Sequence, residues 1–455
     1  MSGMRDDGVK EANRIAVIGL GKIGLGFAAC LARNGFDVLG VDTNLGLVDR
    51  IRTGATVSDE PGIADVVSGA SDGRLRATAD LAEAVSHADT AFLLVPTPSR
   101  PDGSLDSGPL TDAVTALCHA LRAHATRDRF TIIVGSTVSP GTMTGAVIPA
   151  VERTLGRPDC DAVDVCYNPE LVALGSVVAG FECPDLIIIG ASHEAAGARV
   201  ERIHRRLVRN TPVVHHLSLL DAEIAKLALN NYLTIKISFA NFLSQICAGI
   251  PGSDVDAVTR VLGSDGRIGA KCLRAGPAFG GPCFPRDTAA LAAWAGAHRQ
   301  QAPLVDAVVA VNRAQHDLLL QTVRAEAIRA GRPDVAILGL AFKAGTPYTV
   351  ASPSLTLAGA LRAGGHRIIA YDTRALDSHG SAADWPCESA SDAAACIDAA
   401  PVIVLMHPEP PYIDAIAAYR GRERKVVVDC WGALDSSKAD ARVRVLRLGQ
   451  AGRPA

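Results

Sequence analysis

The sequence lacks the features that mark several broad classes of protein. Its eleven cysteines form no CxxC pair and no Cys/His spacing typical of a metal site, so neither a redox motif nor a metal centre is expected. No apolar run reaches the length of a transmembrane helix, and the first residues contain no stretch resembling the core of a signal peptide. No stretch is strongly basic, so nucleic acid is not an expected partner, and without an apolar run of transmembrane length a membrane is not expected either.

The composition instead indicates a soluble globular protein with a large core. The chain has 455 residues, 48% of them hydrophobic and 20% charged, and a formal net charge of -3. This length suggests about three domains. Because thiols outside a disulfide framework are typical of a reducing compartment, we expect the protein in the cytoplasm. Residues 1–12 and about 450–455 are expected to form mobile or disordered tails.

A glycine-rich turn between two apolar runs is the first motif. Residues 14–18 predict a buried parallel strand, Gly19-Leu-Gly-Lys-Ile-Gly24 matches G-x-G-x-x-G, and an apolar helix follows to about residue 34. A second strand over 36–41 ends at Asp42. G-x-G-x-x-G alone is weak evidence, but strand, turn, helix, strand and acid together are typical of a dinucleotide site. Asp42 can accept a hydrogen bond from a ribose 2′-hydroxyl and repels a 2′-phosphate, so the predicted cofactor is NAD.

Polar side chains follow several of the later predicted strands. Further strands are predicted at 90–95, 130–134, 163–167 and 185–190. Thr97, Thr137 and Glu170 come just after three of them, where open α/β sheets bind ligands. The threonines are candidate dinucleotide contacts, and Glu170 could hold or deprotonate a water molecule. A turn hydroxyl and a solvated charge are the ordinary alternatives.

The pattern then changes to a long helix. Residues 221–248 contain neither Gly nor Pro, and a helix of that length usually spans between domains or forms a subunit interface. Lys226 and Asn230 are four residues apart and therefore project from one face. They are either surface polar residues or, respectively, a cation and a hydrogen-bond donor for a developing oxyanion.

The segment Ala275-Gly-Pro-Ala-Phe-Gly-Gly-Pro-Cys-Phe-Pro-Arg-Asp287 is the densest concentration of special residues. Its three prolines argue against a helix, so Cys283 is expected on a rigid loop. The glycines allow close approach of a ligand, and Asp287 could orient the thiol or handle a proton. A buried structural cysteine is the alternative.

The rest of the chain predicts a second α/β unit. Arg267 and Lys271 lie in a glycine-punctuated loop and could meet phosphate. Residues 288–330 predict an Ala-rich helix. Strands are predicted from 335 and at 367–372, 401–406 and 425–429, with a helix at 355–362. The first turn of this unit lacks G-x-G-x-x-G, so Lys343 at its strand exit suits a phosphate-bearing substrate better than a second dinucleotide.

Together these residues resemble the UDP-glucose/GDP-mannose dehydrogenase superfamily over essentially the whole chain, and most of all its UDP-glucose 6-dehydrogenase type. The matching segments are Val17–Gly24, Val41–Asp42, Glu60–Gly62, Val95–Pro98, Ser136–Thr137, Asn168–Glu170, Lys226 with Asn230, Arg267–Lys271, Phe279–Cys283 with Asp287, and Phe342–Lys343. The ordered set is far more specific than any one motif.

The resemblance implies an α/β fold with two Rossmann-like domains, each with a parallel sheet, joined by a long central helix. It implies an NAD-binding domain at 13–215, a central helical dimerisation domain with the cysteine loop at 216–325, and a sugar-nucleotide-binding domain at 326–450. It also implies a homodimer or higher homo-oligomer that oxidises the C6 alcohol of a UDP-sugar to a carboxylate with two NAD+. In that scheme Cys283 forms a thiohemiacetal and then a thioester.

Site residues are carried over from the family motifs one by one. The implied catalytic residues are Cys283, Asp287, Lys226, Asn230, Thr137 and Glu170. The implied NAD-binding residues are Gly19, Gly21, Lys22, Ile23, Gly24, Asp42, Pro96, Thr97, Ser136, Thr137 and Arg286. The implied substrate-binding residues are Glu170, Leu171, Lys226, Asn230, Arg267, Lys271, Phe279, Gly280 and Lys343, with Arg267 reaching the site of a neighbouring subunit.

The chain also departs from the family pattern at several positions. Leu174 replaces a glutamate and Val350 an arginine, both of which family members use near NAD, while Phe242, Pro282 and Arg286 are atypical. Two alternatives therefore stay open. One is a UDP-N-acetylhexosamine or GDP-mannose 6-dehydrogenase, and the other is a diverged sugar-nucleotide-binding member with impaired or partial oxidation.

Overall fold

The computed structural model describes residues 13–55, 58–69, 73–124, 129–156, 159–375 and 385–450. The predicted tails at 1–12 and about 450–455 lie outside these ranges, apart from residue 450. The chain divides into two compact units, an amino-terminal unit of residues 1–228 and a carboxyl-terminal unit of residues 229–455. The division falls inside one continuous helix, α9 (Leu219–Ala248), which is the long helix expected from the sequence.

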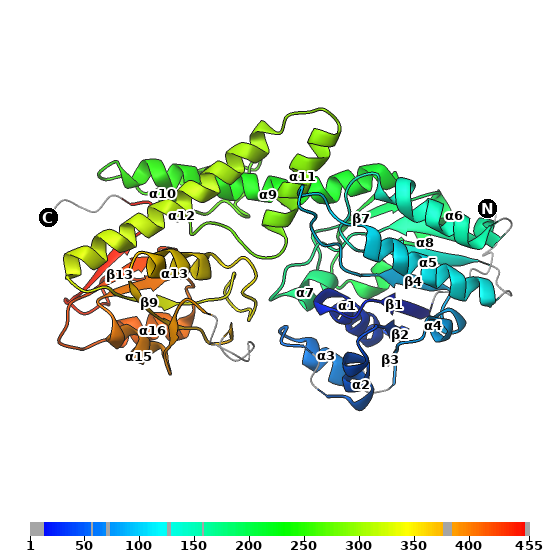
Figure 1. The fold of residues 1–455 in the computed structure, drawn as a ribbon, viewed down its shortest axis with the longest axis horizontal. Coiled ribbons are helices and arrows are strands. Elements are labelled where there is room, and N and C mark those ends of the chain that lie inside the picture. The colour runs from blue at the N-terminus through cyan, green and yellow to red at the C-terminus, as the bar shows by residue number, and fades with distance from the viewer. Residues whose placement is uncertain are drawn as a thin grey trace, which may run out of the picture. The chain divides into compact units, whose positions relative to one another are not determined.

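The amino-terminal unit is built on an eight-stranded sheet (Figure 1). Its strands are β1 (Arg14–Ile18), β2 (Asp37–Val41), β3 (Leu75–Thr78), β4 (Thr90–Leu93), β5 (Phe130–Val134), β6 (Val163–Tyr167), β7 (Leu186–Ala191) and β8 (Val213–Leu217). The order β3-β2-β1-β4-β5-β6-β7-β8 begins with the six-strand arrangement of a dinucleotide-binding fold. All neighbours pair in parallel except β6 and β7, which are antiparallel, so the expected parallel sheet holds with one exception.

Helices cover both faces of this sheet. They are α1 (Lys22–Arg33), α2 (Leu45–Thr53), α3 (Ile63–Gly69), α4 (Leu81–His87), α5 (Gly108–Ala123), α6 (Ile148–Leu155), α7 (Val177–Glu182) and α8 (Glu194–Leu207), with short π and 3-10 turns at Met143–Val147 and Asp159–Ala162. Side chains of a strand alternate between faces. Ile15 and Val17 therefore enter one core with α1, α7 and α8, while Ala16 and Ile18 enter another with α4, α5 and α6.

The carboxyl-terminal unit repeats the architecture with six parallel strands. These are β9 (Asp334–Leu338), β10 (Arg367–Tyr371), β11 (Glu388–Ser389), β12 (Val402–Leu405), β13 (Lys425–Asp429) and β14 (Val443–Arg447), in the order β11-β10-β9-β12-β13-β14. This is again the six-strand order of a dinucleotide-binding fold. The helices of the unit after α9 are α10 (Val255–Ser264), α11 (Phe284–Ala297), α12 (Pro303–Ala330), α13 (Pro353–Ala363), α15 (Ala393–Ala399) and α16 (Pro410–Ala418). Helices α12 and α13 pack on one face of the sheet and α15 and α16 on the other.

The single helix predicted over 288–330 is wrong. Two helices occupy this stretch, because α11 ends at Ala297 and α12 begins at Pro303. Arg299 adopts a left-handed conformation with φ 57°, which ends α11, and a proline fits the first turn of a new helix but not the middle of an old one. The Ala-rich composition concealed this break.

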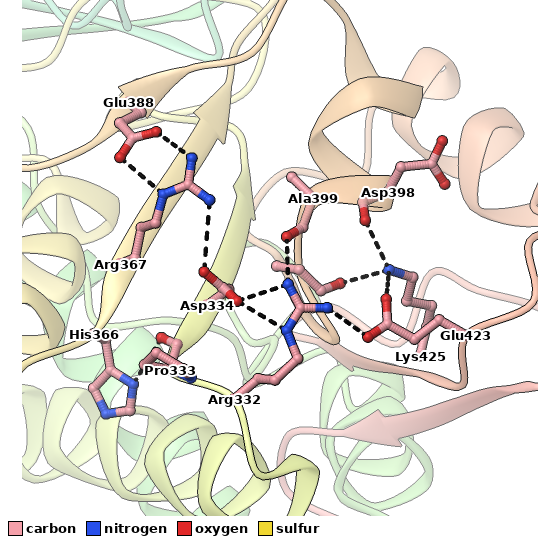
Figure 2. A network of polar contacts seen from close by, with 11 residues as sticks. Arg332, Pro333, Asp334, His366, Arg367, Glu388, Asp398, Ala399, Glu423 and Lys425 are labelled. Atoms are coloured by element: carbon pink, nitrogen blue, oxygen red, sulfur yellow. Dashed lines mark hydrogen bonds and ion pairs between the residues drawn. The ribbon is translucent and has the colours of Figure 1, made fainter.

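An ionic network joins the amino ends of the strands in the second sheet (Figure 2). Arg332 bonds Asp334 at 2.7 Å and Glu423 at 2.7 Å. Lys425, only 1% exposed, donates to Glu423 and to the carbonyls of Asp398 and Ala400, at 2.7, 3.1 and 2.9 Å. The network lies at the sheet edge opposite the one that binds ligands in such folds, so it stabilises the unit rather than forming a ligand site.

The turn after β9 is closed by an aspartate at the end of β10. Asp372 is buried and accepts hydrogen bonds from four backbone amides, those of Leu340, Ala341, Arg374 and Ala375, at 2.6 to 3.0 Å. Asp372 follows β10 as Asp42 follows β2 in the first sheet, so the two aspartates occupy equivalent positions.

Candidate functional site

The glycine turn after β1 is too crowded for larger residues. A Cβ on Gly19 would lie 2.5 Å from the carbonyl oxygen of Leu94, and a Cβ on Gly24 would lie 1.8 Å from that of Gly19. Gly19 also has φ 90°, which glycine adopts without strain. Gly21 is the N-cap of α1, and a Cβ there would meet nothing within 4 Å. The turn thus brings backbone amides to the open amino end of α1, where a pyrophosphate binds favourably.

Asp42 is placed as a ribose acceptor requires. Its two carboxylate oxygens accept from the amides of Leu20 at 2.7 Å and Asn44 at 2.8 Å. A carboxylate has about four lone-pair positions, so two remain for ribose hydroxyls. Lys22 and Ile23 are the first two residues of α1.

The threonines after β4 and β5 contact each other. Thr97 donates to the backbone carbonyl of Thr137 at 2.7 Å, and Ser136 donates to that of Val95 at 2.6 Å. Pro96, next to them, is exposed. The Thr137 hydroxyl is buried and has no hydrogen-bond partner among the residues that the structure describes. An unpaired buried hydroxyl is costly, which fits a group that meets a ligand or a water when the site is filled. With the glycine turn and Asp42, it makes this edge fit NAD.

Glu170 is anchored on the same sheet edge by Lys226. The Lys226 ammonium, only 3% exposed, donates to the Glu170 backbone carbonyl and lies 3.5 Å from its Oε1. The Glu170 Oε2 accepts from the amide of Val172 at 3.1 Å. The structure thus brings Lys226 and Glu170 together, while the role of Lys226 in the site stays a prediction. Leu171 follows Glu170 and is partly buried in the adjoining core.

A buried histidine supports this loop. His204 on α8 donates from Nε2 to Asn168 Oδ1 at 2.6 Å, and Asn168 donates to the carbonyl of Ile188 at 2.8 Å. Burial lowers the pKa of His204 to about 4, so the ring is neutral at physiological pH. His204 was not predicted from the sequence, where it looks like any other polar residue of an amphipathic helix.

Two buried glutamates were also missed as site supports. Glu223, one turn before Lys226 on α9, accepts from the amides of Gly141 and Met143 at 2.8 Å each. Burial raises the pKa of Glu223. Glu60 accepts from the amides of Gly175 and Val177, and its Oε2 is buried without a hydrogen-bond partner among the described residues. Glu60 belongs to a segment noted for its family resemblance, which was the available signal.

In the carboxyl-terminal unit, Cys283 is the N-cap residue of α11. The expectation that the prolines exclude a helix here is therefore wrong from Phe284 onward. Pro285 lies in the first turn, where a missing amide hydrogen costs nothing. The amino end of a helix favours a negative charge, such as a thiolate or an oxyanion. Cys283 is half-buried, and all eleven cysteines are unbridged.

Most other thiols lie in apolar surroundings that disfavour the thiolate. Burial raises the pKa of Cys30, Cys118, Cys166 and Cys396 to about 12 and that of Cys387 to about 11. Cys430 is shifted in the same direction. A nucleophilic role therefore suits Cys283 better than any of these.

Asn230 and Asp287 meet beside Cys283. Asp287, fully buried in the first turn of α11, accepts from Asn230 Nδ2 at 2.6 Å and from Arg286 Nε at 2.8 Å. Asn231 donates to the Asp287 backbone carbonyl at 3.0 Å, and the Asp287 amide donates to the Cys283 carbonyl at 2.8 Å. The predicted grouping of Asn230, Asp287 and Cys283 is thus present in one unit.

Side-chain amides hold the segment before Cys283. Asn241 accepts from the Gly276 amide at 3.0 Å, and Gln315 donates to the Gly276 carbonyl at 2.7 Å. Asn312 accepts from the Phe279 amide at 2.7 Å and donates to its carbonyl at 3.1 Å. These bonds replace the backbone partners that an irregular segment lacks. None of the three amides was predicted, because Asn and Gln on a helix usually face solvent.

The predicted substrate contacts are spread over the carboxyl-terminal unit. Arg267, Lys271 and Lys343 are exposed, and Arg267 is paired with its own neighbour Asp265 at 2.6 Å. Phe279 packs edge-on against Phe284, with ring centroids 6.1 Å apart. A Cβ on Gly280 would lie 2.0 Å from the Ala351 carbonyl oxygen. The cations therefore remain predicted contacts, while Gly280 is required for packing.

Leu174 and Val350, two of the family-atypical positions, have different surroundings. Leu174 packs against the core formed by α1, α7 and β1. Val350 is 55% exposed on the loop before α13.

No helix within the described ranges combines the length and hydropathy needed to cross a bilayer. Nor do three or more His, Cys, Asp or Glu side chains gather as metal ligands in the described part of the chain.

Comparisons with known proteins agree with this geometry. The family models for UDP-glucose/GDP-mannose dehydrogenase match residues 13–208 as the NAD binding domain, 220–314 as the central domain and 336–436 as the UDP binding domain. The UDP-glucose 6-dehydrogenase AglM of Haloferax volcanii is 37% identical over 392 residues, covering 85% of this chain and 90% of the relative. The GDP-mannose 6-dehydrogenase of Azotobacter vinelandii is 32% identical over 363 residues, covering 79% and 81%.

Solved structures place the fold in the same group. The UDP-glucose dehydrogenase of Pyrobaculum islandicum superposes with a TM-score of 0.87 at 30% identity, covering 99% of this chain and 100% of that one. The NAD-type glycine turn, the unpaired Thr137 hydroxyl and the Cys283 cluster lie within the matched regions. The chain belongs to the UDP-glucose/GDP-mannose dehydrogenase family and is an NAD-dependent nucleotide-sugar dehydrogenase.

Proposed function

We propose that the protein oxidises the C6 alcohol of a UDP-hexose, with UDP-glucose as the substrate, to the UDP-uronic acid. The observation that carries this proposal is Cys283 at the amino end of α11, next to the buried Asp287 and its hydrogen-bond donor Asn230. A thiol in that place suits capture of an aldehyde, and a covalent adduct keeps a reactive intermediate on the enzyme between two oxidations. The resemblance to enzymes named UDP-glucose 6-dehydrogenase supports the choice of sugar.

The proposed chemistry has four steps on the sugar carbon. The alcohol loses a proton and a hydride to become an aldehyde. The Cys283 thiolate adds to the carbonyl carbon, and the oxygen takes a proton to give a thiohemiacetal. Loss of a second hydride, together with that proton, converts it into a thioester. Water then attacks and the C–S bond breaks, which yields a carboxylate, the Cys283 thiol and one released proton. Two NAD+ molecules, bound one after the other, accept the hydrides.

Side chains around the nucleophile have distinct roles in this scheme. Asp287 accepts and returns protons, and Asn230 donates to the oxyanion of the adduct while holding Asp287 in place. Arg286 keeps the buried Asp287 carboxylate compensated. Burying an unpaired carboxylate costs much more than burying a paired one, so this ion pair makes a buried base feasible.

The amino-terminal unit supplies the hydrolytic water in this scheme. Glu170 and the unpaired Thr137 hydroxyl hold and orient the water. Lys226 supplies a positive charge that stabilises developing negative charge. Its hydrogen bond to the Glu170 carbonyl keeps the two residues together. Glycines 19, 21 and 24, with Asp42, bind the pyrophosphate and ribose of the cofactor.

We propose that the exposed cations of the carboxyl-terminal unit bind the diphosphate. Lys271 and Lys343 are accessible, and Arg267 has 89% of its side chain exposed. That exposure suits a role for Arg267 in the site of a neighbouring subunit. The UDP binding description of the family model at 336–436 supports placing the nucleotide on this unit.

A homodimer is proposed from the surface of α9. Tyr232, Phe239, Phe242, Ile246 and Ile250 are 43% to 61% exposed. The first four lie on α9 and the last just after it, at spacings of seven, three, four and four residues, so they share one face. An aromatic and aliphatic stripe of this kind is typical of a subunit interface. A homodimer through this stripe and a reducing compartment such as the cytoplasm complete the proposal, the latter supported by the unbridged thiols.

Two other substrates and one loss of function compete with this proposal. The similarity to a GDP-mannose 6-dehydrogenase keeps GDP-mannose in consideration, and UDP-N-acetylhexosamines are the further choice. Leu174 and Val350, at positions where family members use charged residues near NAD, favour a member with partial oxidation. The division into domains at 13–215, 216–325 and 326–450 is likewise a proposal, distinct from the two units described above.

The test is a panel of sugar nucleotides incubated with the purified protein and NAD+, with absorbance read at 340 nm. UDP-glucose is expected to give two NADH per sugar and a uronate by mass spectrometry. One NADH per sugar indicates partial oxidation, and no NADH from any of the sugars overturns the proposal. Cys283→Ser is expected to stop at the aldehyde or at a trapped adduct, so unchanged uronate formation by this variant excludes the cysteine as nucleophile.

A further inference from the structure

One non-glycine residue with a left-handed backbone faces the cysteine segment. Ala351 has φ 48°, and only Cys272 and Arg299 share this feature among the described non-glycine residues. For an L-residue other than Gly or Asn this conformation is strained, and such strain persists only where surrounding contacts enforce it. Ala351 lies in the loop between β9 and α13, directly before Ser352, the N-cap of α13.

The contacts that enforce the strain come from the two glycines before Cys283. The Ala351 carbonyl accepts from the Gly281 amide at 3.2 Å. The same oxygen fills the space of a Cβ on Gly280, which would lie only 2.0 Å away. Turned to the usual right-handed conformation, Ala351 would withdraw its carbonyl from both glycines. Its unusual φ is therefore what brings the two backbones together.

Phe342, nine residues earlier in the same loop, completes the contact. A Cβ on Gly281 would lie 2.4 Å from the Phe342 ring. The Phe342 amide donates to the Tyr348 carbonyl at 2.8 Å, which closes the loop on itself. Lys343, a proposed phosphate contact, is the next residue. One loop thus carries Lys343, the proposed phosphate contact, together with the Ala351 carbonyl and the Phe342 ring, which contact the glycines before Cys283.

We propose that Ala351 is a positioning residue that sets the location of Cys283 through its left-handed conformation. Its carbonyl holds Gly281, two residues from the nucleophile, and Phe342 holds the other side of that glycine. Because Lys343 belongs to the same loop, the place of the diphosphate and the place of the thiol are set by one element. This inference rests on the proposed function for its catalytic consequence, but its geometric part can be tested without turnover.

The test compares valine at two strained positions. Ala351→Val forces a β-branched residue where φ is positive, which disfavours the native loop. Arg299→Val imposes the same strain at the end of α11, away from the cysteine segment. Both variants are expected to lower Tm similarly, by roughly 2–4 °C for a strain of this size. Ala351→Gly adopts positive φ freely and is expected to restore wild-type behaviour.

The readouts separate positioning from stability. The rate at which iodoacetamide modifies Cys283, followed by peptide mass spectrometry against the exposed Cys183, is expected to change in Ala351→Val alone. In the same variant kcat is expected to fall by about 100-fold, as for a small misplacement of a reacting group, while KM for NAD stays unchanged. If Ala351→Val fails to fold, Ala351→Leu, which is not β-branched, gives a milder version of the same comparison.

The outcomes are distinct from those of the proposed function. Equal Cys283 modification rates in Ala351→Val and Arg299→Val overturn the positioning role, whatever the substrate. A changed modification rate at position 351, restored by Ala351→Gly, supports it even if no sugar nucleotide yields NADH. Absence of NADH with wild-type protein counts against the proposed function only.

Discussion

Asn230 donates a hydrogen bond of 2.6 Å to Asp287 and so ties α9 to the first turn of α11. Arg286, the residue directly before Asp287, neutralises the same carboxylate. The carboxylate is fully buried, and each of its oxygens has a charged or polar donor. A buried carboxylate so held is a structural contact and, in the proposed scheme, also the base, four residues after the proposed nucleophile.

Asp287→Asn tests both roles of this carboxylate. The substitution keeps the shape but removes the proton acceptor, so we expect kcat to fall by about 10²–10⁴-fold, the range for a lost general base. The free energy of unfolding should fall by only about 1–3 kcal/mol, because Arg286 loses its partner but retains access to solvent. Steady-state kinetics and urea unfolding measure the two effects. Asp306→Asn, an exposed change in the first turn of α12, is the control, and equal loss of kcat there contradicts the assignment.

Thr137→Val removes a hydroxyl that has no partner among the described residues. Because an unpaired buried hydroxyl costs about 1–3 kcal/mol, the variant should be as stable as the wild type or more so. Its kcat should fall by about 10²-fold if the hydroxyl orients water or cofactor. Thr131, within β5, likewise has a buried hydroxyl without a hydrogen-bond partner in the described part of the chain, so Thr131→Val is a matched control. The control should share the stability effect and keep full activity; identical kinetics for both variants argue against a role for Thr137.

The buried His204 predicts a loss of stability in acid. Its pKa in the folded protein is about 4, below the ordinary value of 6.5, so the unfolded chain binds the extra proton first as pH falls. The contribution of His204 to stability is therefore constant above about pH 6.5 and decreases between pH 6.5 and 4, by up to about 3 kcal/mol. Burial lowers the pKa of His407 too, and that group adds to the same trend.

His204→Gln isolates the contribution of one group. Glutamine can still donate to Asn168 but does not titrate, so its urea unfolding curve should change less between pH 7 and pH 4.5 than that of the wild type. A variant as acid-sensitive as the wild type would show that His204 is not the titrating group.

Lys425 predicts a stability effect without a kinetic one. Lys425→Met keeps the aliphatic stem but leaves Glu423 and two backbone carbonyls without their buried donor, at an expected cost of about 3–5 kcal/mol. Kinetic constants at a temperature where the variant is folded should match the wild type. Lys438→Met, which removes an exposed lysine pairing with Asp435, should cost less than about 1 kcal/mol. Thermal unfolding of the two variants measures both losses of stability.

The apolar stripe on α9 predicts the oligomeric state. Phe239→Glu places a charge in the middle of the stripe and should convert a dimer into monomers, because burying an unpaired charge at an interface is strongly unfavourable. Val261→Glu, on the exposed side of α10, is the control and should leave the mass unchanged. Light scattering coupled to size-exclusion chromatography reads both. A wild-type protein that is monomeric at micromolar concentration rules out the proposed interface.

Much of the fold could be predicted because apolar runs and glycine turns are local signals. The strand at 14–18 and the strands at 130–134, 163–167 and 425–429 match the observed bounds, and the grouping of Asn230 with Asp287 followed from a family motif. The start of α11 was missed because proline was treated only as a helix breaker, although it is favoured in a first turn.

The supporting residues could not be predicted, for a physical reason. Asn312, Gln315 and His204 act on backbone or side-chain groups 33 to 39 residues away, and no local pattern encodes which distant group an amide will meet. Polar residues in otherwise ordinary helices usually predict a solvent-exposed face. Ala351 is hidden in the same way, since its conformation is imposed by glycines in another segment.

Asp42 and Asp372, which close equivalent turns in the two sheets, differ in how many hydrogen bonds they already accept. Asp372 receives four amide hydrogens, as many as a carboxylate has lone pairs, whereas Asp42 receives two. The later acid is saturated by its own backbone and has nothing left to offer a sugar hydroxyl. Grafting a G-x-G-x-x-G turn after β9 would consequently not create a second nicotinamide dinucleotide pocket, because the discriminating acceptor there is already fully used.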